Sequence, residues 1–309
     1  MDPVRALIDG VLAPVLVAAV VVLAIRRPWR SGRADTRGWG VGIALAAAYG
    51  IGFALVLGWP ALPPVDVTHA TPWLAIVAAA IAALPARAAA LRRAAVGILG
   101  LLTGALLVSP LLDHGLGGAS AALHVFLVGA TFVLVDGGLE RALTGLEPRA
   151  GALAVTTLTG GGAVAVLLSD VASLAQVTGG LAAGLGALFA LGLWRPAAAD
   201  VTRATPVVAA VLASTLWSAV LYANGRYEVV ALLAASPLVL WRVGPAVART
   251  RRAIVALAIP TLVILLPIGA AAGLAARAYF AEPAAETAPL AVPDSDSPAA
   301  DGYDPNYGY

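Results

Sequence analysis

The chain has 309 residues, of which 61% are hydrophobic and only 12% charged, and its formal net charge is +2. Soluble domains carry about a quarter charged residues, so this composition excludes a water-soluble globular protein. The chain has no Cys, which excludes disulfides, thiolate nucleophiles and Cys-ligated metal centres. It also has no Lys, which excludes a Walker-type nucleotide-binding loop.

Apolar segments long enough to cross a bilayer recur along the chain. A run of about 20 apolar residues spans the hydrocarbon core, and continuous rather than alternating runs favour helices over barrel strands. We therefore predict an all-α, polytopic integral membrane protein whose residues 1–280 form a bundle of about ten transmembrane helices. The predicted spans are 7–25, 38–58, 72–86, 94–112, 119–137, 151–169, 173–194, 206–223, 229–241 and 253–278. The third and ninth spans are short, so nine spans is the alternative count.

Arg residues mark every second connection between these spans. All Arg residues except Arg5, Arg226 and Arg277 lie in the connections 26–37, 87–93, 138–150, 195–205 and 242–252. Positively charged loops stay in the cytoplasm, so we predict that these connections are cytoplasmic and that both termini lie outside. The expected location is the cell membrane, as a multi-pass protein of the bacterial cytoplasmic membrane surrounded by the lipid bilayer.

The C-terminal segment 281–309 differs from the rest of the chain. It is rich in Pro, Ala, Asp and Glu, and three Tyr lie among its last seven residues. Such a segment buries too little apolar surface to offset its ordering entropy. We predict a disordered acidic tail outside the cytoplasm. It is either a solvated terminus or a docking peptide whose tyrosines anchor a protein partner.

The sixth span contains the most unusual polar sequence of the bundle. Three threonines precede three adjacent glycines near its middle, namely Thr156, Thr157, Thr159, Gly160, Gly161 and Gly162. Each Gly lowers helix propensity by about 1 kcal/mol, and unwound helices at the midplane bind substrates in transporters. We therefore predict a substrate path here, with close packing of a neighbouring helix as the alternative.

The eighth span adds a second predicted lining. Ser214, Trp217 and Ser218 follow helical spacing and lie on one stripe. The stripe predicts a polar lining with an aromatic platform, although Ser hydroxyls can also bond to their own helix backbone.

Asp136 is the acid most deeply placed in a predicted span, close to the cytoplasmic end of the fifth. Ionisable groups inside spans are costly and often functional. The residue is therefore a candidate proton relay, or it forms a charge pair with Arg141 or another Arg of the inner face.

All three histidines lie on the predicted outer side. Asp113 and His114 are adjacent in sequence, and His124 lies about one turn inside the next span. These types of side chain bind divalent metals, but no H-x-x-H or H-E-x-x-H spacing sets a ligand geometry. They are weak metal candidates, and scattered surface polarity is the alternative. We predict no cofactor.

Three functional hypotheses remain open from the sequence. Many spans with short loops are typical of a secondary transporter or permease-like protein, which is the leading hypothesis. The alternative is a non-catalytic membrane subunit or scaffold whose tail recruits a partner. The third is an enzyme acting on lipid-linked substrates through the outer histidines, but the chain carries no motif for catalysis, so we expect no enzyme. The positive-inside pattern explains the Arg-rich loops, so no nucleic-acid partner is expected.

Overall fold

The computed structural model describes residues 5, 7–26, 39–64, 66–248 and 253–281. Within these residues the chain is helical, and no strand is present. After a short π-helix, Ile8–Leu12, the α-helices are α2 (Ala13–Arg26), α3 (Trp39–Leu57), α4 (Val67–Ala82), α5 (Ala89–Asp113), α6 (Gly118–Leu143), α7 (Pro148–Leu167), α8 (Ala172–Trp194), α9 (Thr205–Tyr222), α10 (Tyr227–Ala248) and α11 (Ala253–Ala281). Short 3₁₀ turns, Ala86–Ala88, Pro196–Ala199 and Thr202–Ala204, precede α5 and α9. The predicted tail, apart from its first residue, lies outside the described residues.

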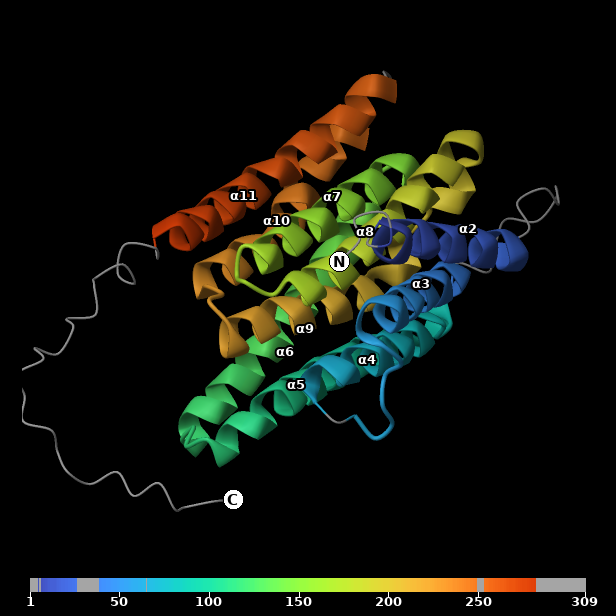
Figure 1. Ribbon diagram of the computed structural model, residues 1–309. Helices are drawn as coiled ribbons and strands as arrows, with labels where there is room; N and C mark the ends of the chain where they lie inside the picture. The colour runs from blue at the N-terminus through green and yellow to red at the C-terminus, as the bar shows by residue number, and fades with distance from the viewer. Residues whose placement is uncertain (1–4, 6, 27–38, 65, 249–252, 282–309) are drawn as a thin grey trace, which may run out of the picture.

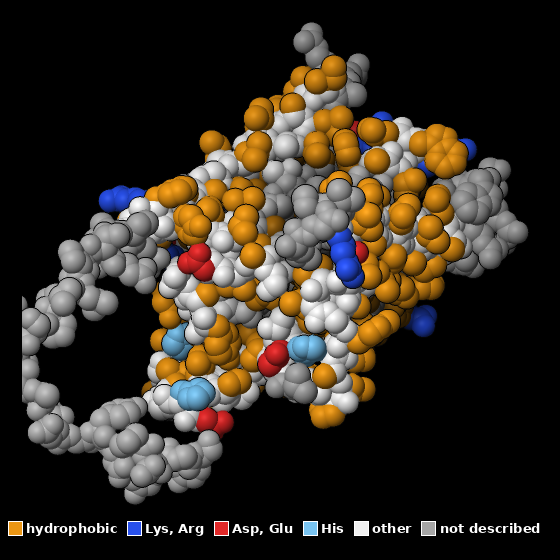
Figure 2. All heavy atoms as spheres, viewed as in Figure 1, with side chains coloured by type: hydrophobic (Ala, Val, Ile, Leu, Met, Phe, Trp, Pro, Cys, Tyr) orange, Lys and Arg blue, Asp and Glu red, His pale blue; other side chains and the backbone are white. Residues whose placement is uncertain are grey.

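The helices have the length and composition of membrane spans. In the described part of the chain, eight helical segments are long and apolar enough to cross a bilayer, and the shorter α4 is also apolar. Hydrophobic side chains cover most of the face in Figure 2, where charged side chains form isolated spots. This surface indicates a membrane-embedded protein.

The central element of the bundle is α9. It contacts α3, α4, α5, α6, α10, α7 and α8, which in that order form a ring around it (Figure 1). Two helices lie outside the ring: α2 packs on α3 and α8, and α11 packs on α7 and α10. Of the apolar 18-residue window in the segment that contains α9, 89% is buried, compared with 22% for the corresponding window of α11. A helix that is apolar on all sides is suited to this fully surrounded position.

The start of α4 shows how local chemistry fixes a helix boundary. Asp66 caps the helix by accepting a hydrogen bond from the backbone N–H of His69 at 2.8 Å. Pro72 lacks the N–H that would bond to the carbonyl of Thr68. The hydroxyl of Thr71 donates to that carbonyl instead, at 2.9 Å. The helix therefore begins at Val67, five residues before the predicted span.

Two further boundaries differ from the sequence prediction in a way that affects the site. The helix α5 begins at Ala89 and α6 continues to Leu143, so both extend into segments predicted to be cytoplasmic connections, 87–93 and 138–150. Arg92 therefore lies on a helix, and it is only 4% exposed. Arg side chains at the end of an apolar run resemble a loop in the sequence, but here the helix continues through them.

Candidate functional site

A cavity of about 390 Å³ opens at the end of the bundle where α5 and α9 end and α4 and α8 begin. Its size falls within the range of small-molecule pockets, about 300–1,000 Å³. Apolar side chains from α4, α5 and α8 form part of the wall. Its polar lining residues are Asp66, Thr68, Ser173, Ser218 and Tyr222. By the predicted topology, this is the outer end.

Ser218 of α9 is a buried polar residue that lines this cavity. It is 5% exposed, and its hydroxyl oxygen has no hydrogen-bond partner in the described part of the chain. Most buried polar side chains are paired, because an unpaired group loses about 1–3 kcal/mol of solvation. A free hydroxyl that borders a cavity can instead bond to a solute.

The neighbouring polar groups are held in fixed positions. The hydroxyl of Tyr222 donates to the carbonyl of Leu107 at 2.5 Å, which joins α9 to α5. Asp66 is held by the capping bond to His69 described above. The helix α8 contributes Ser173 and Leu174 to the lining. The lining is therefore anchored on four helices.

The stripe predicted on the eighth span is only partly brought together. Ser218 borders the cavity, but the hydroxyl of Ser214 donates to its own helix, to the carbonyl of Val211 at 3.1 Å. Trp217 lies about 100° from Ser218 around the helix and faces α6. Its indole N–H donates to the hydroxyl of Thr131 at 3.0 Å.

Trp217 belongs to an aromatic cluster that joins three helices. Its ring lies 5.8 Å from that of Tyr227 and 6.3 Å from that of His124. His124 Nδ1 is 2.7 Å from the carbonyl of Ser120 and therefore carries the proton, so Nε2 accepts from the Tyr227 hydroxyl at 3.0 Å. The cluster connects α6, α9 and α10.

The metal hypothesis gains no support from this arrangement. Within the described residues, no three His, Cys, Asp or Glu side chains are grouped to hold a metal ion. Asp113 and His114 are exposed at the end of α5, and both ring nitrogens of His124 have the contacts just given.

The Thr and Gly residues of the sixth span lie on an uninterrupted helix, α7. The three threonine hydroxyls donate to carbonyls four residues earlier, on Ala152, Leu153 and Val155. A Cβ on Gly161 would lie 2.3 Å from Ile268 of α11, and one on Gly162 would lie 2.6 Å from Leu212 of α9. In this structure these two glycines therefore permit close packing. A Cβ on Gly160 would meet no atom within 4 Å.

A cluster of charged side chains lies at the opposite end of α9. Asp136 is 4% exposed and accepts a hydrogen bond from the hydroxyl of Thr205 at 2.6 Å. Arg92 forms a salt bridge with Glu140 through Nη2, while its Nη1 has no hydrogen-bond partner among the described residues. Arg92 and Asp136 also attract each other electrostatically. Arg141, the partner named from the sequence, lies instead over the Trp241 ring, 5.9 Å from its centroid.

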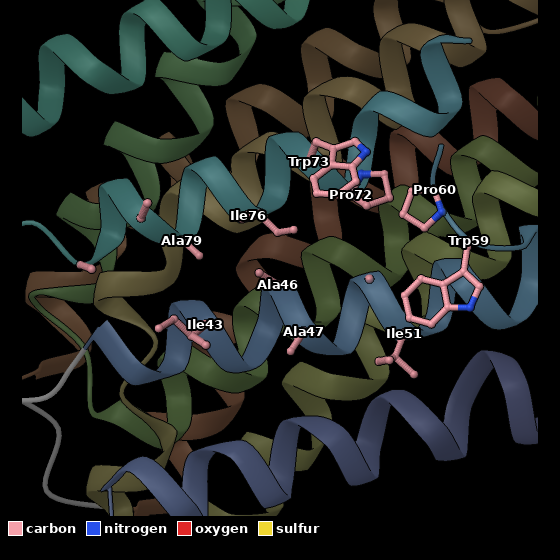
Figure 3. A pocket seen from close by; sticks show the side chains of 13 residues that line it. Ile43, Ala46, Ala47, Ile51, Trp59, Pro60, Pro72, Trp73, Ile76 and Ala79 are labelled. Carbon is pink, nitrogen blue, oxygen red and sulfur yellow. The ribbon is translucent and has the colours of Figure 1, made fainter. Parts of the chain in front are cut away.

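A separate apolar groove of about 610 Å³ lies between α3 and α4 (Figure 3). Its walls are mostly small or aliphatic, including Ile43, Ala47, Gly50, Ile76 and Ala80. Trp59 and Trp73 lie toward one end of the groove, and Trp59 is 80% exposed. Apart from these two tryptophans, the residues that line the groove have aliphatic side chains or none.

Comparison with known proteins finds no matching family, no matching curated protein and no matching solved structure.

The structure therefore has two polar sites, the cavity and the charged cluster, at opposite ends of the buried helix α9. The cavity supplies hydroxyl groups and one carboxylate, which suits binding of a small polar solute. The charged cluster supplies one buried carboxylate, one buried guanidinium and one partly exposed carboxylate, which suits binding or exchange of a proton.

Proposed function

We propose that the protein is a secondary transporter or permease-like protein of the bacterial cytoplasmic membrane, with ten spans and both termini outside. The observation that carries this proposal is the buried hydroxyl of Ser218 on the central helix, which borders the cavity and has no hydrogen-bond partner among the described residues. In this proposal the cavity is the outer vestibule and α9 lines the path.

The lining supports a particular class of solute. Hydroxyl groups donate and accept hydrogen bonds, and Asp66 is the one charged side chain among the residues that line the cavity. A small polar solute that is neutral or cationic fits this lining, whereas an anion would be repelled by the carboxylate. With a volume of about 390 Å³, the cavity can hold one molecule of the size of a small metabolite.

The position of α9 supports transport over simple binding. Thr205 and Ser218 are separated by 13 residues, or about 20 Å along the axis at about 1.5 Å per residue. The central helix thus extends from the outer cavity to the buried charges near the other end. A rigid helix in a ring of neighbours can transmit a change at one end to the other.

The absence of Cys from the chain allows a sharp test. Ser218→Cys is prepared, folded and reconstituted in proteoliposomes, and uptake of a panel of sugars, polyols and small organic cations is measured. A small thiol-specific reagent is then added from the cavity side. We expect uptake of the transported solute to fall at least tenfold after reaction, and that solute to slow the reaction when present in excess.

Two controls make the outcome decisive. The wild-type chain, which has no thiol, must keep its uptake after the same treatment. Ser214→Cys lies one turn away on the same helix and does not line the cavity, so it should react slowly and keep its uptake. Full uptake by a completely modified Ser218→Cys protein would contradict the proposal.

Glycine substitutions in α7 do not give an equivalent test. Gly161→Leu would force a side chain against Ile268, so loss of uptake would report a packing defect as readily as a blocked path. The alternative function, recruitment of a partner through 281–309, depends on residues outside the described part of the chain.

A further inference from the structure

The charged cluster at the start of α9 contains two carboxylates and one cation. Arg92 of α5 is paired with Glu140 of α6, and one of its guanidinium nitrogens, Nη1, has no partner in the described part of the chain. Asp136 lies one turn before Glu140 on the same face of α6 and is held by Thr205 of α9. The single guanidinium is therefore shared electrostatically between two acids.

Four other arginines on the surrounding elements have partners elsewhere. Arg203 donates to the carbonyl of Leu84, at 3.4 Å, and Arg149 pairs with Glu147. Arg141 and Arg242 both lie over the ring of Trp241. Arg92 and Glu140 are the charged groups that interact electrostatically with Asp136 among the residues described.

With both acids ionised, the cluster has a net charge of −1 in a poorly solvated site. Uncompensated buried charge is strongly unfavourable. Binding one proton at Asp136 removes that charge and leaves Arg92 and Glu140 as a neutral pair. Because Thr205 donates to Oδ1, the second carboxylate oxygen, Oδ2, is the position for the proton.

We propose that Asp136 is a reversible proton-binding site and that Arg92 is the group that exchanges between Glu140 and Asp136 as the proton binds and leaves. In the protonated state, an O–H bond forms at Oδ2 of Asp136, and Arg92 remains paired with Glu140. When the proton leaves to water, the ionised carboxylate of Asp136 attracts Arg92 more strongly than Glu140 does. It then accepts hydrogen bonds from Nη1 of Arg92.

Glu140 provides the route to water. Its side chain is 34% exposed, whereas that of Arg92 is 5% exposed. A proton arriving from the aqueous phase therefore meets Glu140 one helical turn before Asp136. Exchange with the solvent occurs at this end of the bundle, which is the cytoplasmic end in the predicted topology.

The proton site also names a coupling ion for the proposed transport function, and this second part depends on that function. Thr205 is the first residue of α9, so its hydrogen bond ties the state of Asp136 to the helix that carries Ser218. Loss or gain of the proton at Asp136 changes the strength of its hydrogen bond with Thr205, which lies at one end of α9. The cavity that contains Ser218 lies at the other end of α9, so the proton and the solute act on the same helix.

Infrared spectroscopy tests the proton site without any knowledge of a substrate. The full-length protein is placed in lipid nanodiscs, and the C=O stretching band of protonated carboxylic acids is followed as pH is varied. We expect a band that disappears as pH rises and is absent from Asp136→Asn at every pH. The Asn side chain keeps the acceptor for Thr205, so this variant should remain folded.

The matched variant Glu140→Gln leaves Arg92 free to pair with Asp136. Its band should persist but disappear at a lower pH than in the wild type. If Asp136→Asn does not fold, carbon-13 labelling of aspartate in the wild type must shift the same band. A wild-type protein without a titrating band, or a band unchanged in Asp136→Asn, overturns the proposal.

The same preparation separates this proposal from transport. A titrating Asp136 band in a protein that moves no solute in the uptake assay overturns the transport function alone. Solute uptake without the band overturns the proton site alone.

Discussion

Trp217 has contacts that make it a junction between three helices. Its indole N–H is bonded to Thr131 of α6, and its ring touches those of His124 and Tyr227. Aromatic pairs contribute about 0.5–1.5 kcal/mol beyond burial, and a hydrogen bond between two uncharged buried groups adds about 1 kcal/mol. The residue therefore contributes to stability independently of any role in a solute path.

Trp217→Phe should lower stability by about 1–2 kcal/mol, because the ring contacts are partly kept while the hydrogen bond to Thr131 is lost. Thermal unfolding of the purified protein in detergent measures the effect as a lower midpoint. Trp59→Phe is the control, since Trp59 is 80% exposed and should leave the midpoint unchanged. Equal midpoints for both variants would show that the cluster is not stabilising.

The sequence singles out residues that are conspicuous in their own run, and the roles expected of them stay predictions. Asp136 stands out as an acid among apolar residues, and Ser218 was found from its helical spacing. Arg92 was missed because a basic residue at the end of an apolar run has the same appearance as a loop residue. The sequence also does not reveal whether a hydroxyl bonds to its own helix, as in Ser214, or has no partner among the described residues, as in Ser218, since the rotamer and the neighbours decide this.

At the scale of helices, small residues determine where pairs approach most closely. Gly100 and Gly104 of α5 face α6, and a Cβ on Gly104 would lie 2.7 Å from the backbone oxygen of Val125. The similarly spaced Gly269 and Gly273 of α11 face no atom within 4 Å. Both pairs have the Gly-x-x-x-Gly spacing that permits close packing of helices, but only the first has a partner helix against the glycines in the described structure.

Gly104→Ala should destabilise the protein by about 1–3 kcal/mol, because a methyl group would meet backbone that cannot rotate away. Gly97→Ala is the matched control on the same helix. A methyl group on Gly97 would meet no atom within 4 Å, so improved helix propensity should raise stability by up to about 1 kcal/mol. Thermal unfolding in detergent distinguishes the two, and a stable Gly104→Ala protein would contradict the close α5–α6 contact.

At the scale of the molecule, the ring around α9 could not have been predicted. The ten predicted spans all lie within observed helices or overlap them closely, since apolar runs of this length have few alternatives in lipid. The arrangement of the helices around α9 is not predictable in the same way. Every span is apolar, so the choice of a packing partner depends on side-chain shape rather than on polarity.

The predicted topology can be tested with single cysteines on this Cys-free chain. His114→Cys is exposed at the end of α5, and Ala197→Cys is exposed in the connection after α8. A membrane-impermeant maleimide should label His114→Cys in intact bacterial cells and Ala197→Cys only after permeabilisation. The opposite pattern would place both termini in the cytoplasm and would make the cavity of Ser218 face inward.

The same approach decides whether α4 crosses the membrane. Its 16 residues extend for about 24 Å, which is shorter than a hydrocarbon core of about 30 Å. The flanking loops can lengthen the span, because α4 is capped by Asp66 at one end and followed by Arg87 at the other. Pro64→Cys should therefore react from outside and Arg87→Cys only from inside. Labelling of both from one side would remove one crossing, reverse the orientation of every later helix and place the two termini on opposite sides.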